Sequence, residues 1–154
     1  MTPVFYFAYG SNMANTRLEE RVGSIQCCGK ATLKNYVIRF NKKGSDGSGK
    51  ANIAKKENSS VEGVLFQLSM KQLKKLDRFE GVALKHYKRE QINVTNATGK
   101  TQKVFAYIAC AKHTKKGLSP TDEYLNHILD GAKEHMLSRK MTAQIENAAF
   151  KEKR

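Results

Sequence analysis

Apolar side chains follow two spacings along the chain, one typical of strands and one typical of helices. Alternating or continuous apolar runs predict strands at residues 5–9, 29–40, 51–54, 61–68, 86–95 and 102–109. Apolar positions three and four residues apart predict helices at residues 15–22, 69–80 and 119–136, and a short amphipathic helix within residues 138–154. Because strands and helices are interspersed along one chain, the sequence predicts an α+β fold.

Polar segments mark the expected connections. Residues 41–50 and 55–60 are rich in small polar and charged side chains, so both are expected to be exposed loops. The five residues 96–100, Asn-Ala-Thr-Gly-Lys, predict a hairpin loop between the last two strands.

Residue types at two helix starts predict where the helices begin. Ser69 is followed by Gln three residues later, which is the spacing of a capping box, and Gly81 is expected just beyond the end of that helix. This arrangement places Glu80 in the last turn. Ser119 is expected to cap a later helix, with Pro120 at the first helical position.

The composition fits a single globular domain spanning residues 1–154. No apolar run is long enough to span a bilayer, and the N-terminus lacks the pattern of a signal peptide, so no membrane association is expected. The three cysteines, Cys27, Cys28 and Cys110, match neither a disulfide framework nor a zinc site. They are expected to be buried, inert thiols, and the protein is expected to be cytoplasmic.

Basic residues outnumber acidic ones by 28 to 14, giving a formal net charge of +14. Such a charge favours anionic partners and could support nucleic-acid binding. The excess is mostly Lys, however, and it is spread along the chain without a recognition helix, an RNP-like pattern or paired Cys and His. We therefore favour a solvated basic surface that attracts an acidic small molecule over a nucleic-acid interface.

Common catalytic and cofactor motifs are missing from the sequence. It contains no HExxH, P-loop, GxGxxG or GxSxG motif, and its four histidines lack the spacing of metal ligands. The histidines are therefore not expected to ligate a metal ion.

Two features remain as candidates for chemistry. The turn Gly10-Ser11-Asn12 follows a buried strand and can present backbone N–H groups to an anionic ligand, although an ordinary strand-turn-helix would look similar. Glu80 has apolar neighbours in the sequence, Phe79 directly before it and Val82 two residues after it. Apolar surroundings raise the pKa of a carboxyl group toward the range of a general base. The alternative is a solvated residue at a helix end.

Five segments, in order, resemble the γ-glutamylcyclotransferase family. They are residues 7–13 (FAYGSNM), 49–53 together with 61–65, 76–82 (LDRFEGV), 86–89 (HYKR), and 119–134. The likeness runs from about residue 5 to residue 137. It implies that Glu80 is catalytic and that the substrate is bound by Tyr9, Gly10, Ser11, Asn12, Met13, Tyr87 and Tyr124.

The resemblance implies a small mixed β-barrel flanked by helices, and a small-molecule γ-glutamyl substrate. In this reaction the α-amine of a γ-glutamyl group attacks its own γ-carbonyl, which yields 5-oxoproline and releases an amine or amino acid. Glu80 would accept the proton of the amine and return one to the departing nitrogen. The turn would hold the glutamyl head group through backbone amides, while the tyrosines exclude water. No metal or cofactor is implied, and a homodimer is left open.

The family has several branches, and the turn separates them. The γ-glutamylamine branch resembles YGTL and the glutathione-specific branch YGSL, whereas Asn12 here favours the branch acting on γ-glutamyl amino acids. A γ-glutamylamine cyclotransferase and a related γ-glutamyl- or acyl-removing tailoring enzyme stay as alternatives. A different class of function, a basic module that binds nucleic acid or another anion on an inactive scaffold, also stays open. The leaving group is expected to lie partly against residues 41–50 and 55–60.

Overall fold

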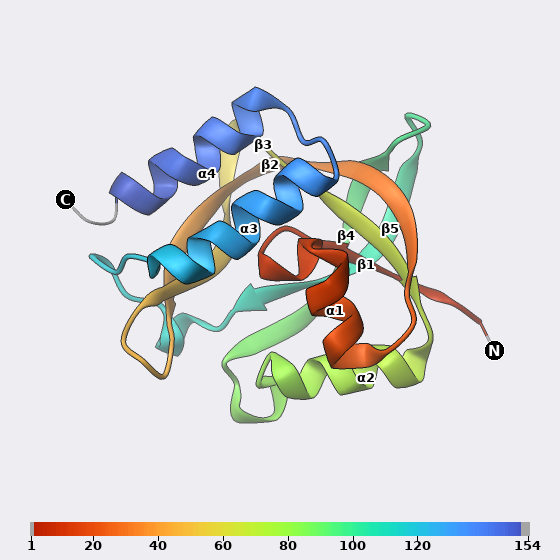
Figure 1. Cartoon of the computed structure of the whole chain (residues 1–154), viewed down its shortest axis with the longest axis horizontal. Coiled ribbons are helices and arrows are strands. Elements are labelled where there is room, and N and C mark those ends of the chain that lie inside the picture. The colour runs from red at the N-terminus through yellow and green to blue at the C-terminus, as the bar shows by residue number, and fades with distance from the viewer. Residues whose placement is uncertain (1, 152–154) are drawn as a thin grey trace.

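Five strands close into a barrel in the order β1-β3-β2-β4-β5 (Figure 1). The computed structural model describes residues 2–151. The strands are β1 (Val4–Ala8), β2 (Gln26–Lys43), β3 (Gly49–Leu68), β4 (Tyr87–Asn96) and β5 (Thr101–Ala109). The predicted α+β class and the small mixed barrel flanked by helices are confirmed.

The first strand closes the barrel. β1 pairs antiparallel with β3, and it pairs parallel with β5 at Tyr6 and Phe105. Phe7 of this strand is fully buried, as are Phe40 of β2 and Phe66 of β3. Burial of each such side chain contributes roughly 1.5–3 kcal/mol to folding. The aromatic run near the N-terminus is therefore part of the core, and the buried turn at residues 11–13 follows it.

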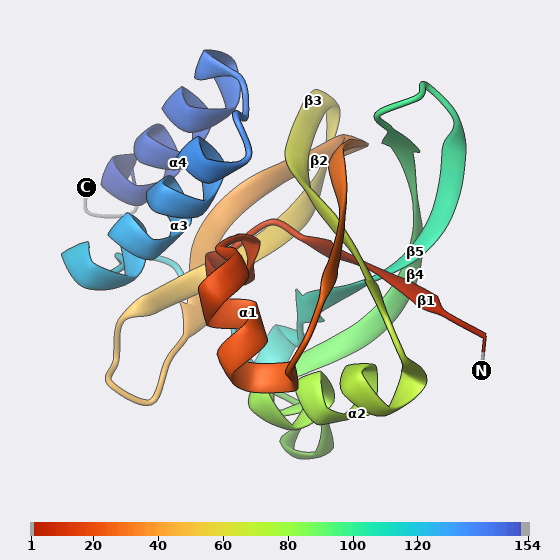
Figure 2. The ribbon, with the colours of Figure 1, turned by 45° about the vertical axis from the view of Figure 1, so that its right-hand side comes forward.

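The hairpin of β2 and β3 is longer than the sequence pattern indicates (Figure 2). Residues 55–60, expected to be a loop, belong to β3, where Lys55 lies opposite Tyr36 and Ser60 opposite Lys34, with a register irregularity between these two pairs. Most of this stretch is exposed, so both of its faces carry polar side chains and no apolar alternation marks it as a strand. Residues 41–50 are likewise strand except for the turn at 44–48.

Within residues 2–151, four α-helices and three short 3-10 helices lie around the barrel. They are α1 (Asn15–Val22), α2 (Met70–Phe79), α3 (Asp122–Glu134), α4 (Arg139–Lys151), η1 (Ser11–Met13), η2 (Val82–Leu84) and η3 (Ala111–His113). α3 and α4 run side by side, with α4 against β2, whereas α1 packs against α2 (Figure 1). This arrangement brings the end of β1, the start of α1 and the end of α2 to one side of the molecule.

The capping box predicted at Ser69 is present. Its hydroxyl accepts a hydrogen bond from Gln72 N, and the Gln72 side chain accepts one from Ser69 N. Gly81 follows the helix in the left-handed conformation, at φ 66°. The predicted start at Ser119 is wrong, because the Thr121 hydroxyl caps α3 by accepting from Tyr124 N, which leaves Ser119 and the following proline outside the helix.

The last predicted helix is also present. Met141, Ile145 and Ala149 of α4 are buried in the core, as their spacing indicates. The charged end expected after residue 151 lies outside the described residues. Across residues 2–151, no helix is long and apolar enough to cross a membrane.

The cysteines are more accessible than expected. Cys27 is exposed, and Cys28 and Cys110 are half-buried, so the expectation of buried thiols is wrong. Cys27 and Cys28 lie near the start of β2, at the rim of the barrel, where the strand is only partly covered.

Removal of the cap should destabilise α2 and with it the protein. We expect Ser69→Ala to lower the free energy of unfolding by about 1 kcal/mol, because Gln72 N loses its acceptor. Ser69→Asp keeps an acceptor and should restore most of that loss. Urea denaturation measures the difference, and an alanine variant as stable as the original chain would contradict the assignment of the cap.

Candidate active site

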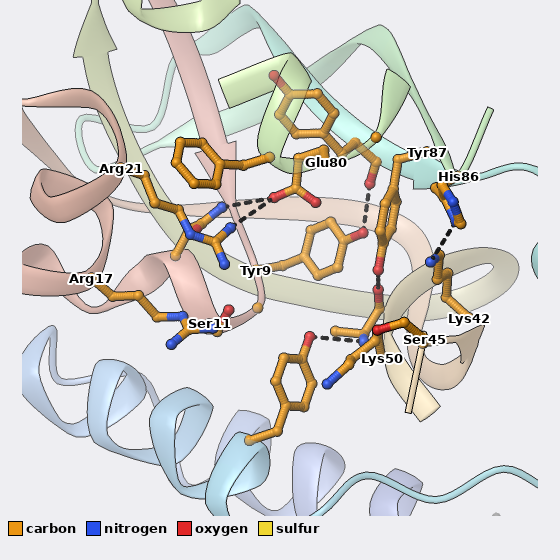
Figure 3. A pocket seen from close by; sticks show the side chains of 18 of the residues that line it. Tyr9, Ser11, Arg17, Arg21, Lys42, Ser45, Lys50, Glu80, His86 and Tyr87 are labelled. Carbon is orange, nitrogen blue, oxygen red and sulfur yellow. Dashed lines mark hydrogen bonds and ion pairs between the residues drawn. The ribbon is translucent and has the colours of Figure 1, made fainter. Parts of the chain in front are cut away.

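A cavity of about 430 Å³ opens where the turn after β1 faces the end of α2 (Figure 3). Its walls come from β1, the turn, α1, the end of the β2–β3 hairpin, the segment after α2, and the starts of β4 and α3. Residues far apart in the sequence therefore share one concave, polar site, which is typical of a small-molecule site.

The structure brings together seven of the eight site residues expected from the sequence. Those lining the cavity are Tyr9, Gly10, Ser11, Asn12, Glu80, Tyr87 and Tyr124. The exception is Met13, which is fully buried and does not line the cavity. Its side chain packs under α3, where a Cβ atom on Gly131 would come within 2.9 Å of the Met13 Cβ. Met13 thus supports the turn from beneath, and the expectation that it touches a ligand is not met.

Glu80 is held from the opposite wall. Asn12 Nδ2 donates a hydrogen bond to Glu80 Oε1 at 3.0 Å and another to the Tyr6 hydroxyl at 3.0 Å. An Arg21 nitrogen lies 3.6 Å from the same Glu80 oxygen. Figure 3 shows the second oxygen of the Glu80 carboxylate directed into the cavity. One carboxylate oxygen is therefore fixed, and the other faces the space where a ligand would lie.

The local backbone explains this position. Glu80 is the C-terminal cap of α2, and the left-handed Gly81 turns the chain away directly after it. A Cβ atom on Gly81 would lie 2.9 Å from the His86 ring, so the lack of a side chain there also lets β4 begin close by.

The surroundings of the Glu80 carboxyl group perturb its titration. Burial raises its pKa, while Arg21, the Asn12 hydrogen bond and Lys42 oppose that effect. The Glu80 side chain is 15% exposed, and it borders the cavity. The pKa of Glu80 is therefore raised, as expected from the sequence. The alternative, a freely solvated residue at the helix end, does not agree with its burial.

Three tyrosines form the polar wall. The Tyr9 hydroxyl donates to Tyr107 O at 2.5 Å, and the Tyr87 hydroxyl donates to Ala51 O at 2.6 Å. Ala51 N donates to the Tyr124 hydroxyl at 3.0 Å, which leaves the proton of that hydroxyl available. Burial raises the pKa of Tyr124 to about 12, so it is a neutral donor at physiological pH.

The cavity is also lined by four cationic side chains that were not expected from the sequence. They are Arg17 and Arg21 of α1, and Lys42 and Lys50 of the hairpin. Among the described residues, Glu80 is the only carboxylate that joins them there. The arginines lie four residues apart just after the turn, so they share a helix face, and this spacing could have identified them. The lysines lie in the segment 41–50, expected to line the leaving-group pocket, whereas residues 55–60 do not line it.

Two buried polar atoms at the site lack partners. Within the part of the chain that the structure describes, Asn12 Oδ1 and Arg17 Nε are the buried side-chain nitrogen and oxygen atoms without a hydrogen bond. Unsatisfied buried groups are costly, and their occurrence beside one cavity points to a polar ligand. Across residues 2–151, no cluster of three or more His, Cys, Asp or Glu side chains is arranged to hold a metal ion.

Known proteins resemble this chain in sequence and in fold. The model of the AIG2-like family matches residues 60–144. YkqA of Bacillus subtilis (strain 168) is 30% identical over 146 residues, covering 93% of this chain and 51% of YkqA. The gamma-glutamylcyclotransferase of Bos taurus is 29% identical over 140 residues, covering 86% of this chain and 71% of that protein.

A solved structure described as a gamma-glutamyl cyclotransferase superposes with a TM-score of 0.87 at 25% identity, covering 94% of this chain and 87% of that one. The chain spans about half the length of YkqA and a larger share of the other relatives.

The raised pKa of Glu80 makes the stability of the protein depend on pH. In the unfolded chain the carboxyl ionises near its ordinary value of 4.5, whereas in the folded protein it holds its proton to higher pH. Its contribution to stability is therefore full below about pH 4.5 and is lost as the pH rises through the folded-state pKa. We expect Glu80→Gln to be more stable than the original chain at pH 7, with the difference shrinking toward pH 4. Thermal denaturation at both values measures this, and a lower melting temperature of the variant at pH 7 would contradict it.

Proposed function

Because the chain belongs to the AIG2-like family, we propose that it is a γ-glutamylcyclotransferase acting on γ-glutamyl amino acids. It would convert them to 5-oxoproline and a free amino acid, with the described residues acting as one domain. The observation that carries this proposal is the Glu80 carboxylate, raised in pKa, tethered by Asn12 and directed into a cavity lined by cations.

The charge of the cavity suits such a ligand. A γ-glutamyl amino acid carries an α-carboxylate on the glutamyl group and a second carboxylate on the leaving amino acid. Arg17 and Arg21 lie beside the turn, and we assign the glutamyl α-carboxylate to them, with the α-amine next to Glu80. The unpartnered Arg17 Nε supports this placement, because a carboxylate would satisfy it.

Glu80 would transfer the protons of the reaction. The α-ammonium passes one proton to solvent through Glu80 and becomes a nucleophilic amine. As this nitrogen bonds to the γ-carbon, Glu80 takes a second proton from it. Glu80 then delivers that proton to the leaving nitrogen while the bond between that nitrogen and the γ-carbon breaks.

The turn after β1 would stabilise the oxyanion that forms on the γ-carbonyl oxygen. Its first backbone hydrogen bond is donated by Met13 N to Gly10 O, at 3.1 Å. The N–H groups of Ser11 and Asn12 come before that bond, at the start of η1, where helical geometry provides no internal acceptor. Donors fixed in advance in this way stabilise developing negative charge without reorganisation.

Confinement would supply much of the remaining acceleration. Attack closes a five-membered ring, so a cavity that holds the glutamyl chain folded makes the reaction effectively unimolecular and well oriented. The rings of Tyr9, Tyr87 and Tyr124 line the cavity and displace water, which would otherwise compete as the nucleophile.

Loss of the carboxylate should abolish turnover. We expect Glu80→Gln to reduce the release of 5-oxoproline from a γ-glutamyl dipeptide at least about 100-fold, because the general base is lost, while the fold and ligand binding stay intact. Glu57→Gln removes an exposed carboxylate on β3 and should act like the original chain. Near-normal 5-oxoproline release by Glu80→Gln would overturn the proposed role.

Crowding of the turn should weaken binding. A Cβ atom on Gly10 would lie 3.3 Å from the Ala51 Cβ and 3.9 Å from the Tyr124 hydroxyl, so the two methyl groups of Gly10→Val enter the ligand space. We expect a raised KM for this variant and a smaller increase for Gly10→Ala. Steady-state kinetics with one γ-glutamyl dipeptide measures both, and an unchanged KM in the valine variant would remove the turn from the binding site.

A further inference from the structure

Two lysines face each other across the β2–β3 hairpin at the mouth of the cavity. Lys42 and Lys50 occupy directly opposite positions in the strand register, and both side chains line the cavity. Like charges opposite one another in an antiparallel pair destabilise a sheet. This pair therefore carries a cost in the free protein, which an anion bound between the two ammonium groups would offset.

Lys42 is the more unusual of the two. Only 6% of its surface is exposed, and none of the described residues forms a salt bridge with it. Its Nζ donates to His86 Nδ1 at 3.0 Å and lies 5.5 Å from the centre of the Tyr87 ring. Because an ammonium group can only donate, Nδ1 accepts, and the imidazole has no negative charge to offer. The charge of Glu80 acts on Lys42 from within the same cavity, but the two do not form a direct ion pair. A buried ammonium group without a directly paired carboxylate is costly, and an anionic ligand beside it would reduce that cost.

Lys50 is directed into the same space by its surroundings. Its Nζ lies 4.4 Å from the centre of the Tyr124 ring, a favourable cation–π position. A Cβ atom on Gly44 would come within 2.8 Å of the Lys50 Cε, so the lack of a side chain there makes room for the lysine. Its one carboxylate neighbour, Asp46, is 3.9 Å away and is already bonded to Ser48 N and Oγ. This ion pair is weak, because 53% of the Asp46 side chain is exposed and solvent screens it, so the charge of Lys50 is only partly compensated.

The two lysines lie at the hairpin side of the cavity, and the two arginines lie at the α1 side (Figure 3). If the arginines take the glutamyl α-carboxylate, as the proposed function has it, the lysines lie where the leaving group extends. One carboxylate, on the leaving amino acid, would meet two cations at a site that also has the exposed Ser45 hydroxyl as a donor.

We propose that Lys42 and Lys50 select an acidic leaving group, so that the preferred substrates are γ-glutamyl conjugates of dicarboxylic amino acids. This inference rests on the proposed function for the orientation of the ligand. The leaving amino acid then brings two carboxylates to two ammonium groups, which balances the charge of this end of the cavity. A leaving amino acid with a neutral side chain would bring only one carboxylate to the two ammonium groups.

Two dipeptides of the same shape test this preference, γ-glutamyl-glutamate and γ-glutamyl-glutamine. The side chain of the leaving amino acid ends in a carboxylate in the first and in an amide in the second. We expect kcat/KM for 5-oxoproline release to be at least about 10-fold higher with the glutamate conjugate, mainly through KM, because a site built for a charged group discriminates against an analogue without it. In Lys50→Met and Lys42→Met the ratio should fall toward one.

Lys43→Met is the matched control. Lys43 is the next residue on the same strand and is exposed, so its replacement removes the same charge from the same hairpin without touching the cavity. The control should keep the preference for glutamate. A preference that falls equally in Lys43→Met would show that general surface charge attracts the substrate, and it would overturn the assignment to the lysine pair.

Binding separates a failure of this inference from a failure of the proposed function. Calorimetry with the 154-residue Glu80→Gln protein, with and without Lys50→Met, measures the affinity for both dipeptides without turnover. Tighter binding of the glutamate conjugate that is lost with Lys50→Met supports the inference even if no dipeptide yields 5-oxoproline. Equal affinity for the two dipeptides overturns it, even if both are converted to 5-oxoproline by the original chain.

Discussion

The hydrogen bond from Asn12 Nδ2 to Glu80 Oε1 joins the two parts of the molecule on which the site depends. One partner follows β1, which closes the barrel, and the other caps α2, whose start is fixed by the capping box at Ser69. The same amide group also donates to the Tyr6 hydroxyl within the core. The position of the carboxylate is therefore determined by the barrel itself, and only one of its oxygens is left for a ligand.

Electrostatics limits what such a site can bind. One buried carboxylate among four cations leaves the cavity with an excess of positive charge, even though the pKa of Glu80 is raised by burial. A group that must accept protons benefits from that raised pKa, and a ligand that brings carboxylates benefits from the cations. The two requirements are met by different walls of the cavity. Arg21 lies beside Glu80, whereas Lys42 and Lys50 come from the β2–β3 hairpin.

Much of this arrangement could be predicted from the sequence, where local signals are strong. Helix α1 lies where its apolar spacing places it, and the capping box fixes the start of α2. The turn after β1 and Glu80, 68 residues apart, face each other as the family resemblance implies. Short-range side-chain chemistry and an ordered set of motifs were enough for these elements.

Other parts depended on long-range pairing. Residues 55–60 carry no apolar alternation, and their place in β3 depends on the pairing of Lys55 and Ser60 with β2, which a local pattern does not show. Nothing in the sequence distinguishes Lys42 and Lys50 from the other lysines, because only the register of the hairpin shows that they lie opposite each other. Met13 was assigned to the ligand with its neighbours in the motif, but the geometry of η1 turns it into the core.

The central claim is that Glu80 faces the α-amine of a γ-glutamyl group while the leaving group extends to the lysine pair. A crystal structure of the Glu80→Gln protein with γ-glutamyl-glutamate tests it most directly. The account predicts the α-amine within hydrogen-bond distance of the side chain at position 80, and a carboxylate of the leaving glutamate between Lys42 Nζ and Lys50 Nζ. A ligand bound in the reverse orientation, with its α-amine at the hairpin, or bound outside this cavity, would contradict it.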